Sequence, residues 1–119
     1  MANEVAWVEV LGKDGAKLQG FYGELFGWSF EQAPGGMPYW MHSVGQDQVG
    51  AGVGNAQDGD GHVTFYVAVD DPQAALDQAE QLGGKTIVPV TEMEMVTFAL
   101  FSDPEGHIVG VIKNQPPQE

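Results

Sequence analysis

Two stretches of this chain follow one pattern: Val5-Ala-Trp-Val-Glu-Val-Leu-Gly-Lys-Asp14 and His62-Val-Thr-Phe-Tyr-Val-Ala-Val-Asp-Asp71. In each, nine positions separate the first residue from the last Asp, and thirteen more lead to a glycine, Gly27 or Gly84. Apolar residues alternate in the same way in both, as expected of a strand with one buried face. Few residues are identical, so this repeat, offset by 57 positions, is one of pattern and spacing.

Each stretch is followed by the pattern of an amphipathic helix. Asp14 can cap the first helix, and Gly27 is a suitable left-handed terminator. Asp71-Pro72 supplies an N-cap with proline at the first helical position of the second helix. The apolar stripe of the first helix consists of Leu18, Phe21, Tyr22, Leu25 and Phe26. The apolar stripe of the second helix, which we expect to be buried, consists of Ala75, Leu76, Ala79 and Leu82.

Three further strands are expected after each helix, so each copy reads β-α-β-β-β and the fold class is α+β. Module one covers about residues 4–54, a polar linker 55–61, module two about 62–113, and residues 114–119 form a tail without expected structure, all within a single domain of residues 1–119. The expected strands are Trp28–Gln32, Tyr39–Val44 and Gln48–Val53, then Lys85–Val90, Met95–Ser102 and His107–Lys113.

One face of each predicted sheet packs on its helix, so the opposite face needs another cover. We expect the two modules to cover each other as a curved-sheet barrel with a cavity between the sheets. The pattern is satisfied equally by modules that pair within one chain and by modules that pair across a dimer.

Composition narrows the classes of partner. The 17 acidic residues outnumber the 4 basic residues, and the formal net charge of −13 disfavours nucleic acid and anionic membrane surfaces. The acids either keep the protein soluble or attract cationic ligands. The absence of cysteine excludes disulfides and thiolate metal sites. No segment has the apolar length of a membrane span, so we expect a cytoplasmic protein.

Three short sequence motifs, taken in this order, resemble those of a known family: Phe21-Tyr-Gly-Glu-Leu-Phe-Gly-Trp28, Val69-Asp-Asp71 and Asp103-Pro-Glu-Gly106. Together with the repeated module, the chain from Val5 to Lys113 resembles the vicinal oxygen chelate superfamily, in its glyoxalase, bleomycin-resistance and dioxygenase-like branch. The resemblance implies paired βαβββ modules, a ligand cavity and commonly a homodimer. It does not fix the activity, because this fold hosts lyases, dioxygenases, thiol transferases and drug-binding proteins.

The resemblance also implies divalent-metal ligands at positions that here hold Trp7, Thr64 and Gly110, and at one position within Gln48–Val53. None of these residues offers the imidazole or carboxylate that such metals require. We therefore expect no metal and no other cofactor. A rebuilt site using Glu9 and His62 remains the alternative, although a catalytic site usually takes three ligands from the protein.

Glu9 is the candidate catalytic residue. A carboxylate among apolar neighbours on its own strand face is partly desolvated and can act as a general base. It can equally form a hydrogen bond with Tyr66 or His62 across the cavity, or transfer a proton with His62. The predicted cavity lining, mostly aromatic and soft, is Trp7, Glu9, Tyr39, Met41, His62, Thr64, Tyr66, Phe98 and Gly110.

Two functions of different class follow from this cavity. The first is a small-molecule binding protein, metal-free, that takes a hydrophobic or aromatic metabolite or drug, with sequestration of the bleomycin-resistance type as one form. The second is a glyoxalase- or dioxygenase-type lyase or isomerase that uses Glu9 as general base or a rebuilt divalent-metal site. A packed barrel with a regulatory or structural role is a third option. Whether the protein is an enzyme stays open at this point.

Overall fold

The computed structural model describes residues 3–45, 48–57, 59–93 and 96–114. They divide into two compact units, which are described separately. The N-terminal unit comprises residues 6–64, and the C-terminal unit comprises the described residues up to Val5 and from Phe65 onward.

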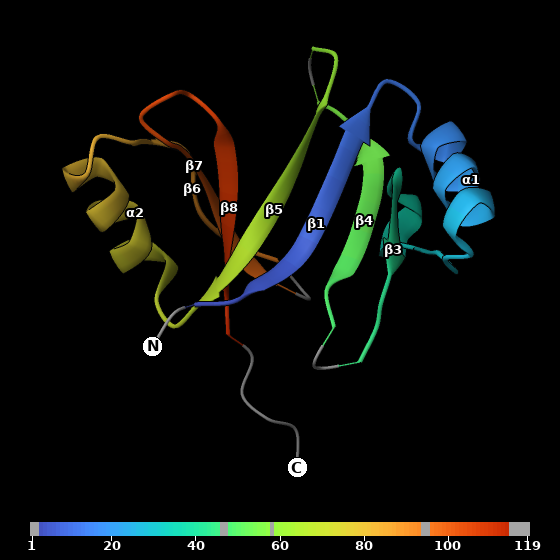
Figure 1. Ribbon diagram of the computed structural model, residues 1–119, viewed down its shortest axis with the longest axis horizontal. Helices are drawn as coiled ribbons and strands as arrows, with labels where there is room; N and C mark the ends of the chain where they lie inside the picture. Colours follow the sequence, from blue (N-terminus) through green and yellow to red (C-terminus); the bar gives the residue numbers. More distant parts are fainter. Residues whose placement is uncertain (1–2, 46–47, 58, 94–95, 115–119) are drawn as a thin grey trace. The chain divides into compact units, whose positions relative to one another are not determined.

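The N-terminal unit contains the first βαβββ module (Figure 1). Its elements are β1 (Val5–Gly12), α1 (Gly15–Phe26), β2 (Glu31–Gln32), a 3-10 turn (Pro34–Gly36), β3 (Tyr39–His42) and β4 (Gly50–Asn55). β1 pairs in parallel with β4, β4 is antiparallel to β3, and β3 is antiparallel to β2. α1 packs on β4 and β3, beside which it lies in Figure 1. Beneath it Val53 is fully buried and Ala51 nearly so.

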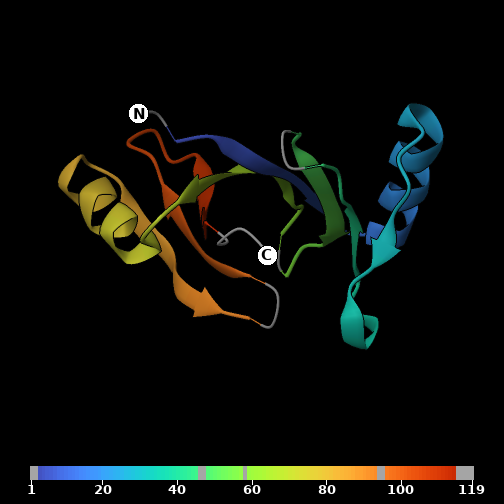
Figure 2. The same cartoon turned by 90° about the horizontal axis from the view of Figure 1, so that it is seen from below.

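The C-terminal unit repeats this arrangement with β5 (His62–Val69), α2 (Pro72–Gln81), β6 (Lys85–Glu92), β7 (Thr97–Ser102) and β8 (Ile108–Lys113). β5 pairs in parallel with β8, followed by antiparallel β7 and β6. α2 covers one face of β6, β7 and β8, as Figure 2 shows from below. Val69, Leu76, Ala99 and Val111 form the buried core between helix and sheet. The predicted pair of βαβββ modules, and the α+β class, are confirmed.

The helix ends follow the predicted chemistry. The Asp14 carboxylate accepts a hydrogen bond from the backbone N–H of Lys17, and Gly27 takes the left-handed conformation with φ of 73°. Asp71 accepts from the backbone N–H groups of Gln73 and Ala74. These bonds satisfy amide groups that a helix leaves unpaired at its N-terminus.

Several predicted boundaries and one predicted burial were wrong. The strand expected from Trp28 begins only at Glu31, because Trp28 and Phe30 stack on neighbouring aromatic rings instead of pairing in the sheet. Leu82 is 70% exposed, since α2 ends at Gln81 and the residue that caps it leaves the buried stripe. Part of the expected strand from Met95 falls outside the described residues.

The first apolar stripe is also only partly covered within the chain. Phe21, Leu25 and Phe26 are each more than half exposed. Tyr22 and Phe26 instead stack with Trp28 along the side of α1. Neither α1 nor α2, the two helices of the described ranges, has the length and apolar character needed to cross a membrane.

Candidate functional site

A chain of two hydrogen bonds joins three side chains of the N-terminal unit. The indole Nε1 of Trp7 donates to the hydroxyl of Tyr39 at 3.0 Å. That hydroxyl donates to Oε2 of Glu9 at 2.8 Å. Trp7 and Tyr39 are half-buried, whereas Glu9 is 9% exposed, so little water reaches its carboxylate.

Strand alternation places these side chains on one face of the sheet. Glu9 of β1 is opposite Gly52 of β4, and Gly52 is opposite Met41 of β3. Tyr39 lies two residues before Met41 and shares its face. Four of the predicted cavity residues of this unit, Trp7, Glu9, Tyr39 and Met41, therefore share a face, while Ala51 and Val53 are buried on the other.

A second predicted group meets in the C-terminal unit. The rings of Tyr66 and Phe98 contact edge to face with centroids 6.5 Å apart. Tyr66 is opposite Gly110, and a side-chain carbon added at Gly110 would overlap the Tyr66 ring. Tyr66, Phe98 and Gly110 thus lie together.

The three histidines occupy different surroundings. The His42 ring stacks on Trp28 at 5.4 Å and its Nδ1 contacts the carbonyl of Ser29, so it belongs to the aromatic cluster beside α1. His62 lies beside the buried Thr64, and its buried Nε2 has no hydrogen-bond partner within the described part of the chain. The proton transfer between Glu9 and His62 stays a prediction.

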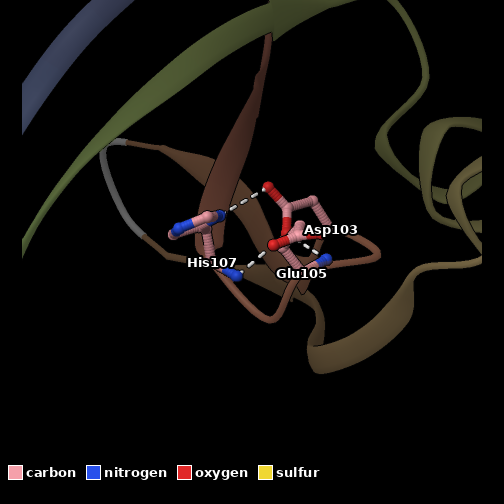
Figure 3. Close-up of polar contacts among 3 residues, drawn as sticks. All are labelled: Asp103, Glu105 and His107. Atoms are coloured by element: carbon pink, nitrogen blue, oxygen red, sulfur yellow. Dashed lines mark hydrogen bonds and ion pairs between the residues drawn. The ribbon is translucent and has the colours of Figure 1, made fainter.

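His107 belongs to the tight turn before β8 (Figure 3). Oδ1 of Asp103 accepts hydrogen bonds from the backbone N–H groups of Glu105 and His107, both at 2.9 Å. Oδ2 of Asp103 lies 3.0 Å from Nδ1 of His107. The bond from the His107 backbone is the largest of several contacts that lower the pKa of Asp103. This carboxylate therefore organises the predicted turn.

The sequence of residues 7–112 matches the family described as the glyoxalase-like domain. The chain belongs to this family. Two curated relatives, each named "Putative glyoxylase CFP32", come from Mycobacterium tuberculosis and Mycobacterium bovis and are 29% identical over 113 residues. That match covers 88% of this chain but 43% of each relative, so the chain spans less than half their length.

Solved structures of other proteins share the fold. A glyoxalase/bleomycin resistance protein/dioxygenase superfamily member from Vibrio splendidus has a TM-score of 0.64 at 15% identity, covering 96% of this chain and all of that chain. A methylmalonyl-CoA epimerase variant from Streptomyces coelicolor has a TM-score of 0.69 at 12% identity, covering 100% and 99%. At these identities the likeness establishes the fold alone.

The side chains at the implied ligand positions do not fit the divalent metal that the resemblance implies. Trp7 presents an indole N–H, a donor that cannot coordinate a cation, and Thr64 is a buried hydroxyl. At Gly110 the Tyr66 ring occupies the space that a ligating side chain would fill. Among the described residues, no three His, Asp or Glu side chains gather into a possible metal site.

The C-terminal unit has a separate hollow of about 330 Å³ on the helix side of its sheet. Val67, Val69 and Val111 lie on its sheet side, and Ala75 and Ala79 of α2 form another wall. Asp103 also lines it, but both carboxylate oxygens of Asp103 are engaged in the turn. The hollow is mostly apolar, and its other polar residues are Asn3, Gln78 and Ser102.

The candidate functional site is accordingly the face that carries Trp7, Glu9 and Tyr39. All three were predicted to line the cavity, and the predicted bond from Glu9 to Tyr66 or His62 stays a prediction. The link to Tyr39 was missed, because Tyr39 and Glu9 belong to strands that are not neighbours in the sheet. The glycine at every second position of β4 was the available signal.

Proposed function

We propose that this glyoxalase-like protein binds a small, planar aromatic molecule with a positively charged or N–H-donating group, at the face formed by Trp7, Tyr39 and Glu9. The observation that carries the proposal is the direction of the hydrogen-bond chain. Trp7 donates to Tyr39 and Tyr39 donates to Glu9, so both donors are directed toward a carboxylate, a group that can accept several hydrogen bonds at once. The aromatic rings beside it suit a flat ligand, and a carboxylate suits a donor or cation.

The charge of the whole chain supports the same ligand class. A formal net charge of −13 attracts cations to the protein surface and repels anions. A ligand with both a ring system and a positive charge would use the ring faces and the carboxylate together. Metabolites and drugs of this kind exist in large number, so the proposal names a chemical class rather than one compound.

The test compares two probes of nearly equal shape, 1-methylquinolinium and 1-methylnaphthalene, by calorimetry or fluorescence titration. We expect the cation to bind about tenfold more tightly, which corresponds to one charge-assisted contact of about 1.4 kcal/mol. Glu9→Gln should remove this preference. Glu24→Gln, at an exposed site on α1, removes the same charge and should keep it. Equal binding of both probes to the natural protein, or an unchanged preference in Glu9→Gln, would refute the proposal.

A second candidate function is proton transfer with Glu9 as general base. The Tyr39 hydroxyl that donates to its carboxylate would hold it in one orientation, as a base requires. In this reaction Glu9 removes a proton from the carbon next to a thioester carbonyl and returns one to the same carbon. The solved epimerases of this fold suggest an acyl thioester as the substrate class, and a short neutral thioester is the first compound to try, because the net charge of −13 repels anions such as a CoA ester. Deuterium incorporation at that carbon in heavy water, absent with Glu9→Gln, would support an enzyme.

We also propose that the protein forms a homodimer. The exposed apolar side chains of α1, Phe21, Leu25 and Phe26, support self-association, because such side chains gain free energy when another surface covers them. Light scattering after size-exclusion chromatography should give twice the chain mass of 12.7 kDa. Leu25→Ser should shift the protein toward the monomer, and a natural protein that elutes as a monomer at high concentration would contradict the dimer.

A further inference from the structure

Glycine occupies every second position of the central strand β4. Gly50, Gly52 and Gly54 pair with Trp7, Glu9 and Leu11 of β1. Gly54 and Gly52 also pair with Tyr39 and Met41 of β3. All three glycines therefore belong to the face of the candidate site, and all three are buried. Because glycine weakens a strand interior, a run of this kind needs a reason that lies in close packing.

Aromatic rings lie directly against these glycines. A side-chain carbon added at Gly50 would come within 2.8 Å of Cε3 of Trp7, and one at Gly54 within 2.7 Å of Cδ1 of Tyr39. A carbon added at Gly52 would overlap the Tyr39 hydroxyl and lie 2.9 Å from Nε1 of Trp7. Atoms in a packed interior do not approach so closely, so any side chain at Gly52 would displace the Tyr39 hydroxyl.

The hydrogen bond to Glu9 depends on that vacant space. β1 and β3 both pair with β4 and not with each other, so the bond from Tyr39 to Glu9 passes over β4. Strands two places apart in a sheet are separated by about 10 Å. Only a long side chain lying flat across the middle strand can reach, and Gly52 is the residue of β4 that pairs with Glu9.

In the C-terminal unit a glycine also lies against a tyrosine ring, although this tyrosine is on β5, at the position where the N-terminal unit has Glu9. Tyr66 follows Glu9 by the 57 positions of the repeat, and it pairs with Gly110 as Glu9 pairs with Gly52. A side-chain carbon at Gly110 would overlap the Tyr66 ring and lie 2.9 Å from its Cγ. In each unit a glycine of the last strand thus makes room for a tyrosine ring.

We propose that Gly52 is a positioning residue of the candidate site: its lack of a side chain lets the Tyr39 hydroxyl reach Glu9 and fixes the direction of the carboxylate. Gly110 likewise leaves room for the Tyr66 ring. The importance of this positioning for a ligand rests on the proposed function, but the positioning itself can be measured without any ligand. Gly52 acts through Tyr39 and is not expected to touch the bound molecule.

The experiment follows the indole N–H signals in a ¹⁵N-labelled protein. The chain has three tryptophans, so three signals are expected, and Trp7→Phe identifies the one from Trp7. Gly52→Ala should move the Trp7 signal in the same direction as Tyr39→Phe and leave the other two in place. Gly20→Ala, where an added carbon meets nothing within 4 Å, should move none. A Trp7 signal that stays in place in folded Gly52→Ala would overturn the proposal.

Two further measurements keep the proposal testable if Gly52→Ala does not fold, or if the natural protein does not bind the proposed ligand. If Gly52→Ala does not fold, the double variant with Tyr39→Ala should fold, because the displaced ring is gone; continued misfolding would count against Tyr39 as the obstacle. In titrations with 1-methylquinolinium, Gly52→Ala and Tyr39→Phe should each weaken binding, and the double variant should bind no more weakly than Tyr39→Phe alone. A natural protein that does not bind this probe refutes the ligand proposal and leaves the indole result standing.

Discussion

The Tyr39 hydroxyl donates a hydrogen bond of 2.8 Å to Oε2 of Glu9, although the two residues are 30 positions apart and lie on strands that do not pair. The bond closes a chain that begins at the Trp7 indole and crosses the glycine face of β4. The N-terminal unit therefore contains a buried carboxylate, that of Glu9, whose orientation is fixed by the neutral hydroxyl of Tyr39. This group is the basis of the function that we propose.

Removing the Tyr39 hydroxyl should lower the stability of the protein. Tyr39→Phe leaves the Glu9 carboxylate without one partner and the Trp7 indole without its acceptor. A hydrogen bond to a charged group contributes about 1.5–3 kcal/mol, so we expect the free energy of unfolding in urea to fall by about 2 kcal/mol. Tyr22→Phe is the control, because Tyr22 contacts Phe26 and Trp28 through its ring. Equal losses in both variants would mean that the hydrogen-bond chain contributes nothing specific.

Truncation of two leucines of the second helical stripe should lower the free energy of unfolding by very different amounts. Leu76 is 2% exposed in the core beneath α2, whereas Leu82 is 70% exposed. Leu76→Ala should therefore cost about 2–5 kcal/mol, the transfer and cavity terms of a buried leucine. Leu82→Ala should change the free energy of unfolding by less than about 0.5 kcal/mol. Similar values for the two leucines would contradict the position at which α2 ends.

Asp103 should make the stability depend on acid pH. Hydrogen bonds from the backbone of His107 and Glu105 lower the pKa of Asp103 in the folded protein below its ordinary value of 3.8. A carboxylate with a lowered folded pKa contributes stability above its unfolded pKa and loses it as pH falls through the folded pKa. Asp103→Asn should therefore be less stable than the natural protein at pH 7, and the difference should shrink below about pH 4. A difference that is constant from pH 7 to pH 2 would exclude this origin.

The protein should be isolated without a stoichiometric divalent metal. Trp7, Thr64 and Gly110 stand where the resemblance implies ligands, and their side chains do not provide imidazole or carboxylate donors. Elemental analysis of protein purified without chelators should find less than about 0.1 metal per chain, since ligand-poor sites retain no ion through purification. One full equivalent of zinc, nickel, manganese or iron would show that a site has been rebuilt from other residues.

Sequence analysis predicted the fold well because two local signals agreed. The repeated strand pattern and the capping residues Asp14 and Asp71 depend on neighbours in the sequence, and the structure follows them. The end of α2 and the late start of β2 were missed, since they depend on where aromatic and apolar side chains find tertiary partners. The bond between Tyr39 and Glu9 was missed for a related reason. It requires the order of three strands, which the repeat alone does not provide.

Restoring an acidic side chain at Gly110 should disrupt the C-terminal unit rather than create a useful ligand. The Tyr66 ring lies over Gly110, and any side chain there overlaps it. Overpacking of this kind costs about 1–3 kcal/mol, and burial of a carboxylate adds to the loss, so Gly110→Glu should be destabilised by at least about 2 kcal/mol. Gly20→Glu introduces the same charge at an exposed position inside α1, where an added carbon meets nothing, and should not destabilise the protein, because Glu favours a helix more than Gly does. In the Tyr66→Ala background the cost of Gly110→Glu should decrease, because the ring is absent. An equal cost in both backgrounds, measured by urea unfolding, would show that Tyr66 is not the reason for glycine at this position.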